Sequence, residues 1–226
     1  MRKVIATLDE ALADVGDGHS IMVGGFGGAG SPRASLGALE RNGAADLRII
    51  INSLRHLDSA APLMFADGRV SSVVCSAARN AGREQSAYEA QWAAGTLEVE
   101  VSPQGSFAER IRAAGAGIPA FYTPTGLGTL LTQGKETRVF DGREYVLELA
   151  IHADFAFVRG QVADPFGNIR CRGTQANFGP AMASASTITI AEVEELSDTP
   201  LAHDAIDIPG MFVQRVVQVR ANGDEG

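Results

Sequence analysis

The residues from Asp17 to Pro32 join a short apolar run to a loop that is nearly free of side chains. Ile21 to Val23 is typical of a strand, and the glycines after it are Gly24, Gly25, Gly27, Gly28 and Gly30. Because glycine has no Cβ and tolerates positive φ, another molecule can approach the amides of such a loop closely. Ser31 and Pro32 suit the N-cap and first turn of a following helix. Loop amides at the positive end of a helix predict a site for an anion or an oxyanion.

Gln104 is a second residue whose position suggests chemistry. It follows Pro103 at the end of an alternating, strand-like run over 97–101, and α/β sheets bind ligands at the carboxyl ends of their strands. A neutral amide there can hold a carboxylate or a carbonyl without competing for a proton. Plainer roles stay open at this stage: a loop hydrogen bond for Gln104, a tight packing turn for the glycines, and core packing for Phe26.

The loop also satisfies a dinucleotide-binding pattern, Gly25-x-Gly27-x-x-Gly30, after a strand and before a helix. That pattern needs an acidic residue at the end of the second strand to bind the ribose. Here the second strand ends in Asn52, and the nearby Asp46 precedes the strand. Nicotinamide or flavin binding, and with it an oxidoreductase, is therefore a minor alternative.

Helix-like and strand-like segments alternate along the chain, which predicts an α/β fold with a mostly parallel sheet flanked by helices in three layers. Helices are expected at 7–16, 32–42, 58–65, 87–94, 106–114 and 178–185, and strands at 20–23, 47–52, 70–75, 97–101, 145–149, 154–159, 187–193 and 212–219. Capping boxes are expected at Thr7 and Ser106, and a cap at Asp58. Trp92 is expected to anchor its helix.

The second half is less regular. Residues 123–140 are rich in glycine, proline and threonine and predict a long irregular segment, which in a compact domain is usually functional or a partner surface. Asp164-Pro-Phe-Gly-Asn168 predicts a hairpin turn between 158–162 and 169–172. With no repeat or linker, we expect one domain over 1–220 and a disordered tail at 221–226.

Composition narrows the possible partners. The formal net charge of −8 with 20% charged residues gives no reason to expect nucleic acid or a membrane surface as a partner. The first residues show no signal-like apolar run, so a cytoplasmic location is expected. Cys75 and Cys171 lack metal-ligand spacing and are expected to be reduced, buried thiols. His19, His152 and His203 are expected to be structural, and we predict no metal site.

The glycine-rich segment resembles the signature of family I coenzyme A transferases, in the half of these enzymes that forms the α subunit. The matching residues are Asp17-Gly18, Ile21-Met-Val23, Gly24-Gly-Phe26, Gly30 and Pro32. Further similar stretches are 102–112, 115–121, 123–129, 142–148, 153–156, Gly167-Asn168, Asn177-Phe178, 191–195 and 209–213. The similarity extends over about residues 1–220 and is to the α subunits of the 3-oxoacid and 3-oxoadipate CoA transferases.

This resemblance implies one half of a two-part enzyme. In the family, the β subunit carries a catalytic glutamate in a Ser-Glu-Asn-Gly motif, which forms an acyl-glutamyl anhydride and then a glutamyl-CoA thioester. The motif does not occur in this sequence, so no catalytic residue is expected here and the nucleophile should come from a β subunit. The resemblance implies that succinyl-CoA donates CoA and that a 3-oxoacid accepts it. It also implies an α2β2 assembly. CoA and acyl-CoA are substrates, and no permanently bound cofactor is expected.

The resemblance also implies which residues meet the substrate. Asn52 matches an asparagine that the family places at the acyl pocket. The substrate or oxyanion-binding candidates are Gly24, Gly25, Phe26, Gly27, Gly28, Asn52 and Gln104.

The chain departs from the family pattern at three places. It has Asn52-Ser-Leu-Arg-His56 where members usually read Ser-Asn-Asn-Ala-Gly, Gly160-Gln-Val-Ala-Asp164 where they commonly read Ala-Trp-Lys-Ala-Asp, and Asn177-Phe-Gly-Pro180 where they read Asn-Phe-Asn-Pro. The first departure makes Arg55 and His56 candidates for substrate selectivity, because a guanidinium pairs with the second carboxylate of a dicarboxylic acid. A solvated Arg55, a hydrolase or lyase subunit, and a non-catalytic partner subunit are the alternatives. Arg110 and Arg112 are expected at the surface or at a subunit interface.

Overall fold

The structure is a computed structural model that describes residues 3–79, 82 and 84–220; the tail expected to be disordered at 221–226 lies outside the described residues. An eight-stranded sheet has the order β11-β10-β8-β1-β2-β3-β4, with β9 paired to β8. Its strands are β1 (Ser20–Val23), β2 (Leu47–Ile51), β3 (Val70–Cys75), β4 (Glu98–Val101), β8 (Ala153–Ala163), β9 (Ile169–Arg170), β10 (Ser186–Leu196) and β11 (Arg215–Gln218). All pairs are parallel except β8 with β9.

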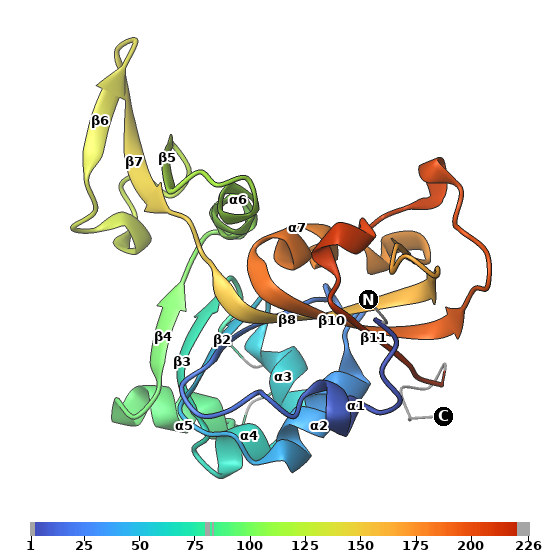
Figure 1. Ribbon diagram of the computed structural model, residues 1–226. Helices are drawn as coiled ribbons and strands as arrows, with labels where there is room; N and C mark the ends of the chain where they lie inside the picture. The colour runs from blue at the N-terminus through green and yellow to red at the C-terminus, as the bar shows by residue number, and fades with distance from the viewer. Residues whose placement is uncertain (1–2, 80–81, 83, 221–226) are drawn as a thin grey trace.

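Helices cover both faces of this sheet (Figure 1). On one side lie α1 (Leu8–Ala11), α2 (Arg33–Asn42), α3 (Leu54–Ala60), α4 (Leu63–Ala66) and α5 (Ala87–Ala94), and on the other α6 (Gln104–Gly115) and α7 (Gly179–Ser184). The α/β, three-layer, mostly parallel architecture predicted from the sequence is confirmed.

The nearly continuous apolar strands explain the two cores. Along β1, Ile21 and Val23 join the core beneath α1–α5, whereas Met22 joins the core beneath α6 and α7. Successive residues of a strand point to opposite faces, so a strand that is apolar throughout must be covered on both sides. Burying these side chains from both faces is the main favourable term in holding the layers together.

A three-stranded antiparallel sheet of order β5-β7-β6 projects from this body (Figure 1). It consists of β5 (Ala120–Thr123), β6 (Thr137–Phe140) and β7 (Arg143–Leu149). Asp141 and Gly142, with φ of 49° and 76° respectively, join β6 to β7 through the left-handed conformation that tight two-residue hairpins favour. The prediction of an irregular segment over 123–140 is therefore wrong for residues 137–140, which pair with β7.

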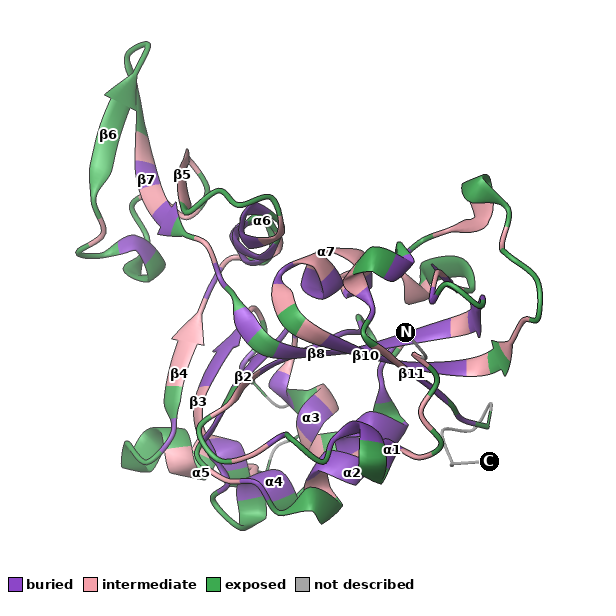
Figure 2. Cartoon of the chain, in the orientation of Figure 1, coloured by how far each residue is buried: buried purple, intermediate pink, exposed green. Residues whose placement is uncertain are grey.

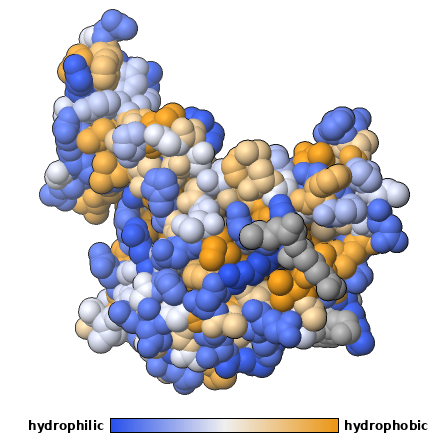
Figure 3. All heavy atoms as spheres, in the orientation of Figure 1, coloured by the Kyte–Doolittle hydropathy of each residue, from blue (hydrophilic) through white to orange (hydrophobic). Residues whose placement is uncertain are grey.

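The projecting sheet is much less buried than the body. Every residue of β6 is exposed, as Figure 2 shows. Figure 3 shows hydrophobic residues on this part of the surface, where Val139 is 62% and Phe140 40% exposed. Among the short 3-10 turns of the described chain, η1 (Leu130–Thr132) precedes β6, and η2 (Gly173–Gln175), η3 (His203–Ala205) and η4 (Gly210–Phe212) follow β9.

Several local expectations are corrected. Asp58 lies inside α3 and does not cap a helix, and α4 begins after Pro62. The helix expected from Ser106 begins two residues earlier, at Gln104, so Ser106 is a buried helical residue. In each case the residue expected to cap lies within a helix that begins before it.

Two further expectations concern side chains and helix ends. The helix that opens at Thr7 ends at Ala11, well before Gly16. Trp92 is 39% exposed, and Tyr88, which is fully buried against Phe65, is the anchor of α5. The predicted hairpin turn at 164–168 is confirmed by the antiparallel pairing of β8 with β9. Within the described residues, no helix has the length and apolar character needed to cross a membrane.

Candidate functional site

Two of the predicted site residues touch at the carboxyl edge of the sheet. Asn52 directly follows β2, and Gln104 begins α6 just after β4. The Gln104 Nε2 donates to Asn52 Oδ1 at 3.1 Å, and Ser76 Oγ donates to the same oxygen at 2.6 Å. Asn52 is 5% exposed, so these two bonds fix its amide in a protected position. The position of Gln104 after a strand and the family resemblance for Asn52 thus identified two members of this cluster, while Ser76, which directly follows β3 between β2 and β4, was missed.

The glycine-rich loop uses several of its own amides to hold its shape. Gly24 N–H donates to Phe157 O at 2.9 Å, and Phe26 and Ala29 exchange N–H···O bonds of 3.0 Å each. Gly25 N–H donates to Asn177 Oδ1 at 3.2 Å. Within the described chain, the amides of Gly27 and Gly28 make no hydrogen bond. Both residues are exposed, so of the substrate-binding candidates Gly24, Gly25, Gly27 and Gly28 these two have amides open to an anion.

Two glycines of this loop are required by close packing. A Cβ at Gly30, where φ is +69°, would lie 2.2 Å from the carbonyl oxygen of Gln175. A Cβ at Gly25, where φ is +113°, would lie 3.0 Å from Ser31 Cα. Any side chain at Gly30 would force the two segments apart, since real Cβ atoms do not approach a carbonyl so closely.

An open pocket of about 490 Å³ lies beside this loop. It is lined by Phe26, Gln104, Gly105, Ala108, Glu109, Arg112, Asn177, Phe178 and Ala181. Phe26 is 48% exposed, with its ring centroid 6.4 Å from that of Phe178. The alternative that Phe26 packs in the core is therefore wrong, and its ring is available to a bound molecule.

The start of α2 differs from the expectation. Ser31 does not cap the helix; Pro32 occupies the N-cap position and provides no side-chain bond. Instead, the Oε2 of Glu192 on β10 accepts from Ser35 N–H at 2.8 Å and from Ser35 Oγ at 2.9 Å. The protein's own carboxylate thus occupies the helix end that was expected to attract an external anion.

Glu192 is fully buried and is paired with a cation. Its Oε1 accepts from Arg159 Nη1 at 2.8 Å, and the two residues lie opposite each other on β10 and β8. Burial raises the pKa of the Glu192 carboxyl, and the bonds from Ser35 and the charge of Arg159 oppose that rise. Arg159 also contacts Glu194, which in turn binds Arg172 near η2.

Arg55 and His56 lie at the start of α3, three and four residues after Asn52, and neither lines the pocket beside Phe26. Arg55 is exposed and His56 is half-buried. Burial lowers the pKa of the His56 imidazole, and the charges of Arg55 and Arg33 lower it further. The two predicted selectivity residues therefore belong to a basic region next to Asn52, and their role stays a prediction.

The remaining reactive groups are explained by the fold. Arg110, expected at a surface or an interface, is buried and paired with Glu100 and Glu148. Cys75 is buried as expected, whereas Cys171 is only half-buried. Desolvation raises the pKa of both thiols to about 12, which keeps them protonated at neutral pH. His19 Nδ1 accepts from Gly16 N–H. The part of the chain that the structure describes contains no group of three or more His, Cys, Asp or Glu residues arranged to hold a metal ion.

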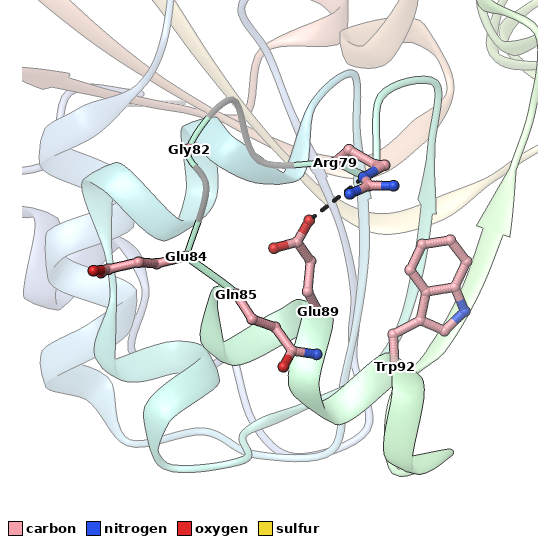
Figure 4. A pocket seen from close by; sticks show the side chains of 6 residues that line it. All are labelled: Arg79, Gly82, Glu84, Gln85, Glu89 and Trp92. Atoms are coloured by element: carbon pink, nitrogen blue, oxygen red, sulfur yellow. Dashed lines mark ion pairs between the residues drawn. The ribbon is translucent and has the colours of Figure 1, made fainter.

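A second cavity, of about 450 Å³, lies beside α5 and is lined by Arg79, Gly82, Glu84, Gln85, Glu89 and Trp92. Figure 4 shows the Arg79 guanidinium directed toward Glu89, with 3.9 Å between Arg79 Nε and Glu89 Oε1. Glu89 also completes the capping box of α5 with Ser86. Arg79 and Glu89 thus offset each other's charge, and none of the predicted site residues lines this cavity.

The fold and the pocket define an α/β protein that presents a glycine-rich loop and two amide side chains at the carboxyl edge of a parallel sheet. Residues 5–219 match a family model described as Coenzyme A transferase. The chain belongs to the coenzyme A transferase family.

Individual relatives agree with this assignment. The chain is 44% identical over 220 residues to the A subunit of the 3-oxoadipate CoA-transferase of Pseudomonas putida, covering 97% of this chain and 94% of that protein. It is 41% identical over 217 residues to the A subunit of the succinyl-CoA:3-ketoacid coenzyme A transferase of Helicobacter pylori, covering 96% and 92%. The fold is similar to that of glutaconate coenzyme A-transferase from Acidaminococcus fermentans, with a TM-score of 0.83 and 24% identity over 98% of this chain and 77% of that one.

Proposed function

We propose that this chain is the α subunit of a heteromeric CoA transferase that moves CoA from succinyl-CoA to a 3-oxoacid. The observation that carries the proposal is the 44% identity, over nearly the whole of both chains, to the corresponding subunit of a 3-oxoadipate CoA-transferase. The contact between Asn52 and Gln104 beside the glycine-rich loop supports it, because it gives this subunit a place to receive the acyl group.

The nucleophile in this proposal is a glutamate of a β subunit with a Ser-Glu-Asn-Gly motif, in an α2β2 assembly. Its carboxylate attacks the thioester carbonyl of succinyl-CoA and expels CoA thiolate, forming an acyl-glutamyl anhydride. CoA thiolate then attacks the glutamyl carbonyl, releasing succinate and forming a glutamyl-CoA thioester. The acceptor carboxylate then attacks the glutamyl-CoA thioester and expels CoA thiolate, forming a second acyl-glutamyl anhydride. CoA thiolate attacks the acyl carbonyl of this anhydride, which yields the new acyl-CoA and the free glutamate.

This chain contributes binding and charge stabilisation. The open amides of Gly27 and Gly28 are donors suited to a carboxylate or to the oxyanion of an addition intermediate, where fixed donors are most effective. The Gln104 amide holds a carbonyl or carboxylate near Asn52, and the exposed ring of Phe26 covers apolar parts of the substrate. Arg55 pairs with the distal carboxylate of a dicarboxylic acceptor. A cytoplasmic location, expected from the sequence, stays part of the proposal.

The test is to assay the chain alone and with its candidate β subunit, using succinyl-CoA and a panel of mono- and dicarboxylic acids, and to identify acyl-CoA products by mass spectrometry. New acyl-CoA species are expected from the pair and not from the chain alone. Free CoA without a new thioester would instead show that water is the acceptor. Loss of carbon dioxide from an acyl-CoA would show a lyase.

Two variants in the same assay separate the remaining alternatives. Gln104→Ala is expected to lower kcat/KM by roughly tenfold, the effect of one lost hydrogen bond to a charged group, whereas a silent subunit would leave the rate unchanged. Arg55→Ala is expected to reduce the preference for dicarboxylic over monocarboxylic acceptors. An unchanged preference would show that Arg55 is only a solvated surface residue.

A further inference from the structure

The side chain of Asn177 connects two segments that are far apart in the sequence. Its Oδ1 accepts from Gly25 N–H at 3.2 Å and from Phe178 N–H at 2.7 Å. Its Nδ2 contacts the carbonyl oxygens of Ala29 at 3.0 Å, Thr174 at 2.8 Å and Gln175 at 3.1 Å. One amide group therefore bonds both to the glycine-rich loop and to its own segment, which runs from η2 to α7.

Asn177 binds the glycine-rich loop at Gly25 and Ala29, the residues on either side of its turn. Gly25 precedes Phe26, and Ala29 exchanges two backbone bonds with Phe26. Between them lie Gly27 and Gly28, whose amides make no hydrogen bond within the described chain. Fixing Gly25 and Ala29 thus fixes the short turn that carries both open amides.

The backbone of the Asn177 segment is also adapted to this contact. Asn177 has a positive φ of 20°, a conformation that asparagine tolerates better than most non-glycine residues. Two residues before Asn177, the carbonyl oxygen of Gln175 lies so close to Gly30 that a Cβ added there would be 2.2 Å from it. The next residue, Phe178, lines the pocket with Phe26 and packs against Phe107.

We propose that Asn177 is a positioning residue: it holds the glycine-rich loop, through Gly25 and Ala29, in the conformation that exposes the Gly27 and Gly28 amides and the Phe26 ring. An amide suits this position because it offers an acceptor to Gly25 N–H and donors to the Ala29 carbonyl from one planar group. An aspartate at this position would keep the acceptor oxygen. Its second oxygen would replace Nδ2 and face the three carbonyl oxygens that Nδ2 contacts. The catalytic consequence of this positioning rests on the proposed function, whereas the structural link does not.

Two substitutions test the proposal in the assembled enzyme. Asn177→Gly tolerates the positive φ and removes the side chain, and Asn177→Asp keeps the Oδ1 acceptors and removes the donors. Asn168→Asp is the matched control, because Asn168 also bonds through both ends of its amide, to Asp164 and Gly210, and does not line the pocket. The measurements are hydrogen–deuterium exchange of residues 24–31 and the separate kcat and KM for succinyl-CoA.

Both Asn177 variants are expected to speed hydrogen–deuterium exchange of residues 24–31 about fivefold or more. The control variant Asn168→Asp is expected to leave the exchange of these residues unchanged. The Asn177 variants are also expected to lower kcat by roughly ten- to a hundredfold with a smaller change in KM, because misplaced groups stabilise the transition state poorly. Unchanged exchange in both variants, or an equal rise in the Asn168 control, would overturn the structural link. Faster exchange with unchanged kcat would overturn the positioning role. If the wild-type pair transfers no CoA, the proposed function fails while the exchange data still decide the link.

Discussion

Glu192 shows how one buried side chain can change the chemistry of a helix end. The first turn of α2 follows the glycine-rich loop and offers Ser35 N–H to an acceptor, and Glu192 already fills that role. Arg159, on the adjacent strand β8, donates to the other oxygen of the Glu192 carboxylate and balances its charge. Ser35 N–H is therefore not available to an external anion, and the helix start is a structural joint between α2 and the centre of the sheet.

Replacing Glu192 by glutamine is expected to lower the free energy of unfolding by about 3 kcal/mol, the lower end of the cost of breaking a buried ion pair. The loss is at the lower end because Glu194 still contacts Arg159. Urea unfolding followed by circular dichroism measures it. The control is Glu109→Gln, which removes the exposed pair with Arg112 and is expected to cost less than about 1 kcal/mol. Equal losses in the two variants would contradict the assigned role of Glu192.

The residues that sequence reasoning found and missed differ in one physical respect. Asn52 and Gln104 could be predicted because each lies at the end of a recognisable strand, where parallel strands bring their carboxyl ends to one edge, and because Asn52 also matches the family pattern. Glu192 and Asn177 meet the glycine-rich loop region across 157 and 152 residues of sequence. No local pattern marks such contacts; the only signal for Asn177 is its place in the family resemblance.

At the scale of elements, β8 and β10 are longer than their sequence patterns indicate. A strand is expected over 154–159, with 158–162 as the first strand of the hairpin, and another over 187–193, whereas the structure has 11 residues in each, Ala153–Ala163 and Ser186–Leu196. Charged residues usually mark the end of an apolar strand. Here Arg159 and Glu192 are paired partners in the middle of the ladder, so the strand continues through them. The position of β10 follows from its apolar pattern, whereas its extension beyond Val193 follows from the ladder with β8, in which Glu195 and Leu196 lie opposite Val162 and Ala163.

The junction of β1 and β8 should make stability depend on pH. Asp154 accepts from the Ser20 hydroxyl and the Ser20 N–H, and these bonds hold the pKa of its carboxyl below the usual range. Because the native state holds this proton less tightly than the unfolded chain, the stabilisation is present above roughly pH 4 and is lost as the pH falls through the native pKa. The free energy of unfolding of Asp154→Asn, measured between about pH 5 and pH 3, is expected to fall less steeply than that of the wild type.

The control for this experiment is Asp67→Asn. The Asp67 side chain is exposed and forms no hydrogen bond within the described chain. The steep fall of the wild type should be retained in this variant. A slope as shallow as that of Asp154→Asn would show that the bonds from Ser20 are not the source of the pH dependence.

At the scale of the whole molecule, the small sheet β5-β7-β6 projects from the body (Figure 1). A cluster of charges lies where the two parts meet. Glu148 on β7 is 1% exposed and accepts from Lys135 Nζ at 2.7 and 2.9 Å. Arg110 on α6 lies 3.7 Å from the same carboxylate and donates to Leu149 O. The strand expected over 145–149 is confirmed as part of β7. The partner strands β5 and β6 were missed because each has only four residues and β6 is exposed throughout, so they carry little apolar alternation.

Glu148→Gln tests whether this charge cluster holds the small sheet as a unit that can open separately from the body. The substitution removes the charge that faces Arg110 and Lys135, so local opening of the sheet should become easier while the apolar cores of the body keep their packing. Hydrogen–deuterium exchange is expected to speed by roughly tenfold or more over residues 137–149 and to stay unchanged in β1, β2 and β8. Glu144→Gln on the same strand is the control, because its side chain is exposed, and it should leave both regions unchanged. A parallel rise in β1, β2 and β8 would mean that the two sheets open together and that the molecule is a single cooperative unit.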